Sequence, residues 1–183
     1  AIEKSSNVAI AKLINQNYQD RPRRFVDLLE RIGAIRTTGI DLKGEPEPIL
    51  TRPGSTTWSR VSLPWLATGY GVQLTPLQVL AFYNAIANNG AYMQPYIVQR
   101  IKGNSADQRT YEPRILQDRI CSEKTLAAVR AMLEGVVEHG TARNIYKPDF
   151  RIAGKTGTAK IAVDGQYQKI YRSSFVGYFP ADA

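Results

Sequence analysis

Cysteine and histidine are almost absent from this chain of 183 residues, which contains one of each, Cys121 and His139. A single cysteine cannot form a disulfide within the chain, and we expect Cys121 to be structural. His139 leaves one candidate base for a Ser–His or Cys–His mechanism. Because His139 precedes Gly140 at the predicted end of a helix, we expect it to cap that helix instead. No metal site and no cofactor are predicted.

Long hydrophobic runs are also lacking. No segment approaches the roughly 18 apolar residues of a membrane span, and the polar start, residues 1–7, does not resemble a signal peptide. The composition, 43% hydrophobic and 22% charged, is that of an ordinary globular protein. The length is sufficient for one domain with a sizeable core.

Acidic residues are fewer than basic ones, 16 against 24, which gives a net charge of +8. Nucleic acid is the first partner that such a charge suggests. The basic residues are spread along the chain, however, and the tightest cluster is Arg21, Arg23 and Arg24. There is no zinc-finger spacing and no aromatic-rich RNA-binding motif. We therefore predict no nucleic acid partner, and a basic surface that faces an anionic environment such as a cell envelope.

Apolar periodicity and capping residues predict four helices. The first follows Ser5-Ser6-Asn7, and the others end at Gly33, begin at Thr75-Pro76, and extend from Ser122 to Gly140. We expect a loop-rich segment over 34–71, held in place by Trp58 and Trp65, a strand over 96–101 and a polar connection over 103–113. The predicted apolar faces are Val8, Ile10, Leu13 and Ile14; Phe25, Leu28, Leu29 and Ile32; Leu77, Leu80 and Ala81; and Leu126, Val129, Leu133, Val136 and Val137.

The last third of the chain indicates a strand, a turn at Asp164-Gly165 and a second strand. Helices followed by an antiparallel hairpin predict a mixed α/β (α+β) fold, in which helices flank an antiparallel sheet.

The hairpin begins with RIAGKTGTAK, residues 151–160, and Gly154-Lys155-Thr156 within it looks like the end of a phosphate-binding loop. That motif requires a glycine five positions before Gly154, where the chain has Asp149, whose charge would repel phosphate. It also requires a helix after the threonine, where a strand is predicted. The sequence therefore argues against a nucleotide site.

Lys155-Thr156-Gly157 is also one of the active-site motifs of serine β-lactamases and penicillin-binding proteins, which accompanies Ser-x-Asn and Ser-x-x-Lys motifs. Ser5-Ser6-Asn7 supplies a Ser-x-Asn triplet directly before a helix. Each triplet is weak alone, because Ser5 or Asn7 could cap the helix and Lys155 could be a solvated edge lysine. Their order and their placement on a helix start and a hairpin strand strengthen the case.

Further stretches extend the resemblance over essentially the whole chain. They are residues 37–42 (TTGIDL), 69–78 (GYGVQLTPLQ), 87–90 (ANNG), 140–142 (GTA), 153–160 (AGKTGTAK) and 174–180 (SFVGYFP). Together they resemble the transpeptidase domain of class B, monofunctional penicillin-binding proteins, most closely the division-associated type.

The resemblance implies a peptidoglycan D,D-transpeptidase that forms a serine acyl-enzyme and is a target of β-lactams. Ser5, Asn7 and Lys155 would be catalytic: Lys155 would supply positive charge, Ser5 would relay a proton and Asn7 would hold the substrate amide. Thr156, Gly157 and Thr158 would bind substrate, and the Thr158 N–H would form half of an oxyanion hole.

One motif of the family is not found. No serine lies three residues before any lysine of the chain. We therefore expect the nucleophile in an upstream segment and a final strand and helix downstream. Residues 1–183 would then be part of a single transpeptidase domain, incomplete at both ends and inactive alone.

The implied partners are stem peptides that end in D-Ala-D-Ala, β-lactams, the remainder of the domain and other division proteins. The implied location is the cell envelope, in an extracytoplasmic domain of a membrane-anchored protein. A β-lactamase, a D,D-carboxypeptidase, and a non-catalytic β-lactam sensor or division scaffold remain as alternatives.

Overall fold

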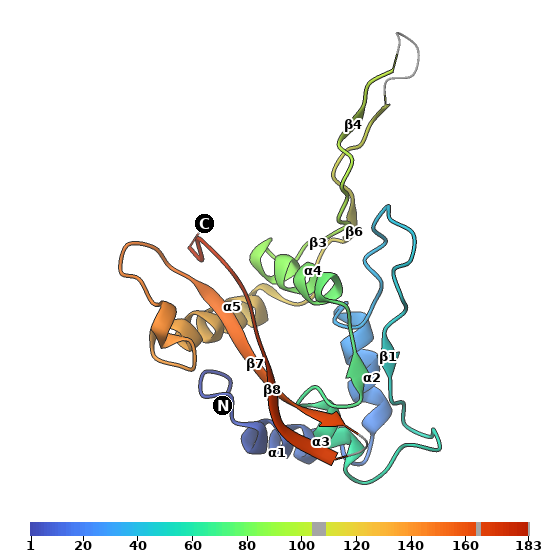
Figure 1. Ribbon diagram of the computed structural model, residues 1–183, viewed down its shortest axis with the longest axis vertical. Helices are drawn as coiled ribbons and strands as arrows, with labels where there is room; N and C mark the ends of the chain where they lie inside the picture. The colour runs from blue at the N-terminus through green and yellow to red at the C-terminus, as the bar shows by residue number, and fades with distance from the viewer. Residues whose placement is uncertain (104–108, 164–165, 183) are drawn as a thin grey trace.

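A computed structural model describes residues 1–103, 109–163 and 166–182 (Figure 1). The helices are α1 (Asn7–Tyr18), α2 (Pro22–Arg31), α3 (Ser62–Leu66), α4 (Pro76–Ala87) and α5 (Glu123–Glu138), with a short 3-10 helix, η1 (Arg143–Ile145). The strands are β1 (Ile49–Leu50), β2 (Val72–Gln73), β3 (Tyr92–Met93), β4 (Arg100–Ile101), β5 (Arg109–Thr110), β6 (Ile115–Gln117), β7 (Ala153–Val163) and β8 (Gln166–Tyr178).

The long antiparallel hairpin β7–β8 is the main sheet of the described residues. Lys155 lies opposite Val176 and Gly157 opposite Ser174, with one irregularity between Lys160 and Ala162. Helix α5 packs against β7 and helix α4 against β8 (Figure 1). The predicted combination of helices and an antiparallel hairpin is thus confirmed, while the predicted turn at Asp164-Gly165 lies outside the described residues.

Helix starts were predictable because their caps are local. Thr75 and Gln78 form a reciprocal capping box, in which Thr75 Oγ1 accepts from the Gln78 backbone N–H at 3.2 Å and Gln78 Oε1 accepts from the Thr75 N–H at 2.9 Å. Ser122 caps α5 by accepting from the Thr125 N–H at 3.3 Å. Both starts were predicted at these residues.

Two clusters form most of the core. The larger one joins α4, α5 and the start of β7 through Ala85, Tyr92, Leu126, Leu133 and Ala153. The second joins α2 and α3 through Phe25, Val26, Leu63 and Leu66, and Ile14 of α1 packs against it. The predicted apolar face of α5 is confirmed, since Val136 and Val137 are also buried.

The predicted apolar face of α1 is only partly correct. Ile14 packs inward, but Val8 and Leu13 are exposed, and no residue of α1 is fully buried. On α4, Leu80 is likewise exposed, and Gln78 takes an interior place because its amide donates to Glu45 and to the Pro46 carbonyl. The spacing of apolar residues identifies one face of a helix, but the elements that pack against this face determine how much of it is buried.

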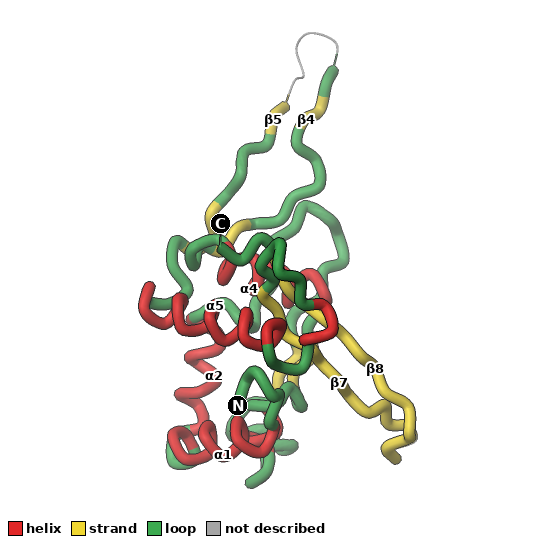
Figure 2. The backbone as a smooth tube through the Cα atoms, turned by 90° about the vertical axis from the view of Figure 1, so that its left-hand side faces the viewer, coloured by secondary structure: helices red, strands yellow, loops and turns green. Residues whose placement is uncertain are grey.

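The loops were predicted less well. Within 34–71 the chain forms the strand β1 and the helix α3, neither of which was predicted. Trp58 is half-buried against the second cluster as expected, but Trp65 is 55% exposed. The strand expected over 96–101 is reduced to β4, which pairs with β5 in an arm that projects from the body (Figure 2). The predicted connection over 103–113 falls partly outside the described residues.

Candidate active site

All six predicted site residues line one cavity of about 820 Å³ beside β7. Ser5 and Asn7 reach it from the start of α1, and Lys155, Thr156, Gly157 and Thr158 from the strand. The turn after α3 closes another wall. The further lining residues are Ile10, Ala67, Thr68, Gly69, Tyr70, Thr141, Asn144, Ala159, Ser173 and Ser174.

Lys155 is the centre of the polar contacts. Its Nζ donates to Ser5 Oγ at 2.9 Å, across 150 positions of sequence, and to the Thr156 carbonyl oxygen at 2.8 Å. Burial lowers the pKa of Lys155 below its ordinary value. Lysine and serine are therefore in direct contact, and the amine gives up its proton more readily than an exposed lysine does.

Ser5 is held in this position by the backbone around it. Its φ of 50° lies in the left-handed region, and its N–H donates to the Ile2 carbonyl at 2.9 Å in a tight turn. The helix cap is Ser6, whose Oγ accepts from the Ala9 N–H at 3.3 Å. The alternative in which Ser5 or Asn7 caps the helix is therefore wrong, and both side chains are left on the cavity wall.

Thr141 is a site residue to which sequence reasoning gave no role. Its hydroxyl lies 2.6 Å from the Thr156 hydroxyl, and its N–H donates to the Glu3 carbonyl at 3.1 Å. Thr141 therefore connects β7 to the turn that carries Ser5. The only signal for it in the sequence was the Gly140-Thr141-Ala142 triplet.

Gly140 allows this turn to approach α5. A Cβ added there would lie 2.5 Å from the Glu3 carbonyl oxygen and 2.6 Å from the Val136 backbone. The sequence suggested that Gly140 ends the helix and begins a Gly-Thr-Ala triplet. The structure shows that the absent side chain lets residues 1–5 lie against the end of α5.

His139 is the C-cap residue of α5, as predicted. Its Nε2 lies 2.8 Å from Glu3 Oε2, and its carbonyl oxygen accepts from Lys4 Nζ at 2.6 Å. These contacts tie the end of α5 to the residues just before Ser5.

The structure also bears on the rejected nucleotide site. Lys155 and Thr156 lie inside β7, not between a strand and a helix, so the phosphate-loop geometry is not formed. Gly157 lies opposite Ser174, and a Cβ at position 157 would come within 2.6 Å of Ser174 Oγ. In the part of the chain that the structure describes, no cluster of metal-binding side chains is formed and no helix is long and apolar enough to cross a membrane.

Comparison with known proteins gives consistent matches. Residues 1–183 match the model of the penicillin-binding protein transpeptidase domain. The chain is 35% identical over 175 residues to stage V sporulation protein D of Bacillus subtilis (86% of this chain, 26% of that protein). It is 30% identical over 182 residues to the peptidoglycan D,D-transpeptidase FtsI of Escherichia coli K12 (98% of this chain, 28% of that protein).

Solved structures agree in fold. The crystal structure of penicillin-binding protein 3 from Mycobacterium tuberculosis, complexed with ampicillin, matches 99% of this chain and 41% of its own, with a TM-score of 0.84 and 32% identity. The chain spans only about a quarter of the length of the two curated relatives above.

Proposed function

Because the chain belongs to the penicillin-binding protein transpeptidase family, we propose that it forms part of the active site of a peptidoglycan D,D-transpeptidase. The substrate would be a stem peptide that ends in D-Ala-D-Ala, and β-lactams would acylate the same site. The observation that carries the proposal is the contact of Lys155 with Ser5 at the wall of a cavity that also contains Asn7, Thr156, Gly157 and Thr158.

The polar side chains have complementary roles in this proposal. A hydroxyl both donates and accepts, so Ser5 relays a proton between Lys155 and the leaving amine. The Asn7 amide holds the amide of the substrate, and the charge of Lys155 attracts its terminal carboxylate. Thr156 takes part through its hydroxyl, whose position is supported by its contact with Thr141.

The attacking serine is proposed to lie outside these 183 residues, in a Ser-x-x-Lys motif. Ser5 is unsuited to that role because the lysine that it contacts, Lys155, lies 150 positions away in the chain. The Ser-x-x-Lys motif of this family requires a lysine three residues after the serine. Labelled penicillin added to the full-length protein, followed by peptide mapping, tests this assignment. We expect one adduct on a serine outside residues 1–183, whereas an adduct on Ser5 would contradict it.

The remaining assignments follow from the relatives. Their names refer to sporulation and to a peptidoglycan D,D-transpeptidase, and we place the protein in the cell envelope, in a division-type role. The extracytoplasmic placement, a membrane anchor and partner proteins of the division machinery belong to the same proposal. An amine acceptor added to the acylation assay separates transpeptidation from plain hydrolysis, which a carboxypeptidase or β-lactamase would give.

We expect Thr158→Val to slow penicillin capture a few-fold and Thr158→Pro to slow it by about 10²–10³, the typical effect of losing one oxyanion-hole donor. Valine removes a hydroxyl but keeps the backbone N–H, whereas proline removes that donor. Stopped-flow acylation measures the rates, and circular dichroism checks that both variants are folded. Equal rates in two folded variants would show that the Thr158 N–H does not stabilise the oxyanion.

A further inference from the structure

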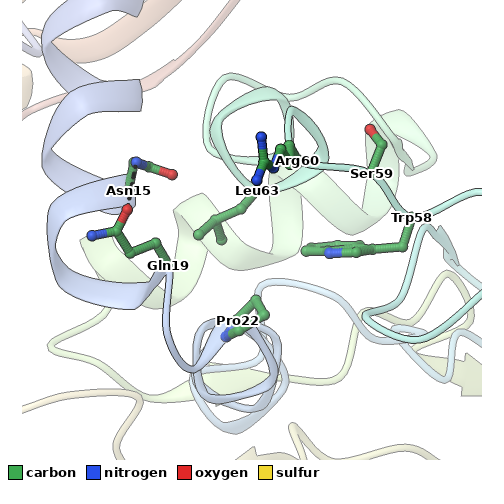
Figure 3. A pocket seen from close by; sticks show the side chains of 7 residues that line it. All are labelled: Asn15, Gln19, Pro22, Trp58, Ser59, Arg60 and Leu63. Carbon is green, nitrogen blue, oxygen red and sulfur yellow. Dashed lines mark hydrogen bonds between the residues drawn. The ribbon is translucent and has the colours of Figure 1, made fainter.

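Two further cavities lie along the 51–71 segment, and one of them is adjacent to the active-site cavity. Tyr70 lines both the active-site cavity and a second cavity of about 260 Å³. Ser59 lines the second cavity and a third of about 710 Å³, which lies between the end of α1 and Trp58 (Figure 3). The second and third cavities are here called the side groove; they are adjacent to each other at Ser59, and the second is adjacent to the active-site cavity at Tyr70.

The second cavity combines two aromatic rings with several hydroxyl groups. Trp65 is 55% exposed and Tyr70 is 38% exposed, and their ring centroids lie 6.1 Å apart. The hydroxyl side chains that line the same cavity are Thr51, Thr57, Ser59 and Ser62. Exposed aromatic faces offer apolar contact, and hydroxyls both donate and accept hydrogen bonds.

The third cavity combines one aromatic ring with two side-chain amides. Trp58 faces it from one side, and the amides of Asn15 and Gln19 face it from α1 (Figure 3). Asn15 Nδ2 donates to Gln19 Oε1 at 3.2 Å, which orients the two amides relative to each other. An amide supplies one acceptor and two donors, so this end of the groove also suits a ligand rich in hydroxyl and amide groups.

The charge of the side groove disfavours a cationic ligand. Among the residues described by the structure, no carboxylate lines the side groove, and Arg60 is its one charged side chain. An acceptor stem peptide with a free ammonium group would find no counter-charge here. Neutral pyranose rings, which present C–H faces to aromatic rings and hydroxyl and acetamido groups to polar side chains, fit the lining better.

The hydrophobic core and backbone hydrogen bonds hold the aromatic pair of Trp65 and Tyr70 in place. Leu63 and Leu66 of α3 are buried in the second core cluster, while Trp65 of the same helix points out. The Trp65 carbonyl oxygen accepts from the Thr68 hydroxyl and from the Tyr70 N–H, both at 3.0 Å. An aromatic pair that is held in place before binding loses little conformational freedom when a ligand binds.

We propose that the side groove is a glycan subsite, which binds the neutral N-acetylated sugar backbone of the strand whose stem peptide enters the active-site cavity. This inference rests on the proposed function, because it assigns the same substrate a second point of attachment. Two linked contacts raise the effective concentration of the stem peptide at the cavity. The protein would therefore process polymeric strands with a lower KM than it does free stem peptides.

The test uses the full-length protein with Trp65→Ala, since Trp65 does not line the active-site cavity. The probe is a peptide-free oligosaccharide of β-linked N-acetylhexosamines, titrated by calorimetry. We expect binding about tenfold weaker than in the unmodified protein, equivalent to about 1.4 kcal/mol. The KM for polymeric strands should rise by a similar factor, with kcat and penicillin capture unchanged. Trp65→Phe should restore much of the affinity.

Tyr146→Ala is the matched control, because Tyr146 is 49% exposed and lies outside the side groove. The proposal is overturned if Trp65→Ala binds the oligosaccharide as well as the unmodified protein does. It is also overturned if acrylamide quenching of single-tryptophan variants shows that Trp65 is covered in the full-length protein. If the unmodified full-length protein does not capture penicillin, the proposed transpeptidase function is contradicted, whatever the result of the oligosaccharide titration.

Discussion

Lys155→Ala is expected to slow covalent capture of a labelled penicillin by the full-length protein about 10³-fold, within the range for loss of a positioned acid–base group. The variant removes the amine that donates to Ser5 Oγ at 2.9 Å and the positive charge that faces the cavity. Both the proton relay and the attraction for an anionic ligand are lost together. Stopped-flow fluorescence measures the rate.

The same substitution should change the melting temperature little. Burial lowers the pKa of Lys155, so the folded state binds this proton less tightly than the unfolded state does, and below the ordinary lysine value of 10.5 this difference costs the fold free energy. Alanine removes that cost together with the hydrogen bonds to Ser5 and Thr156, and the two effects oppose each other. Lys160→Ala, on the exposed part of the same strand, is the control and should retain full capture. Normal capture by Lys155→Ala would remove Lys155 from the mechanism.

Gly140→Ala is expected to destabilise the domain by about 3 kcal/mol, the upper end for overpacking at a tight contact. The added Cβ would lie 2.5 Å from the Glu3 carbonyl oxygen and 2.6 Å from the Val136 backbone, and neither can rotate away. Residues 3–5 must move, so Ser5 leaves its contact with Lys155. We expect a lower melting temperature and penicillin capture slowed at least tenfold at a temperature where the variant is still folded.

Gly44→Ala separates this steric effect from a general effect of glycine replacement. Gly44 has a φ of +98°, and a Cβ there would meet nothing within 4 Å. Its replacement should cost about 1–2 kcal/mol of backbone strain without changing the rate of capture. If Gly140→Ala captures penicillin at the normal rate, the approach of residues 1–5 to α5 does not position Ser5.

The parts of the fold that local chemistry controls were predictable. Thr75 and Ser122 cap their helices through hydrogen bonds to residues three positions away, and the apolar face of α5 is visible as a spacing. Helix α3 was missed because Pro64 lies within it and its five residues form less than two turns. The burial of Gln78 was missed because it depends on Glu45 and Pro46, more than 30 positions away.

The sequence by itself identified six residues of the candidate site, because Ser-x-Asn and Lys-Thr-Gly are short patterns whose residues are neighbours in the chain. Only the tertiary structure decided which of these groups touch. Ser6 takes the helix cap and leaves Ser5 to Lys155, Thr141 reaches Thr156, and Gly140 admits the turn that carries Ser5. The Ser6 cap is local, but the contacts of Lys155 with Ser5, of Thr141 with Thr156 and of Gly140 with the turn each join residues more than ten positions apart. Such contacts are set by packing of the whole domain, which no local pattern records.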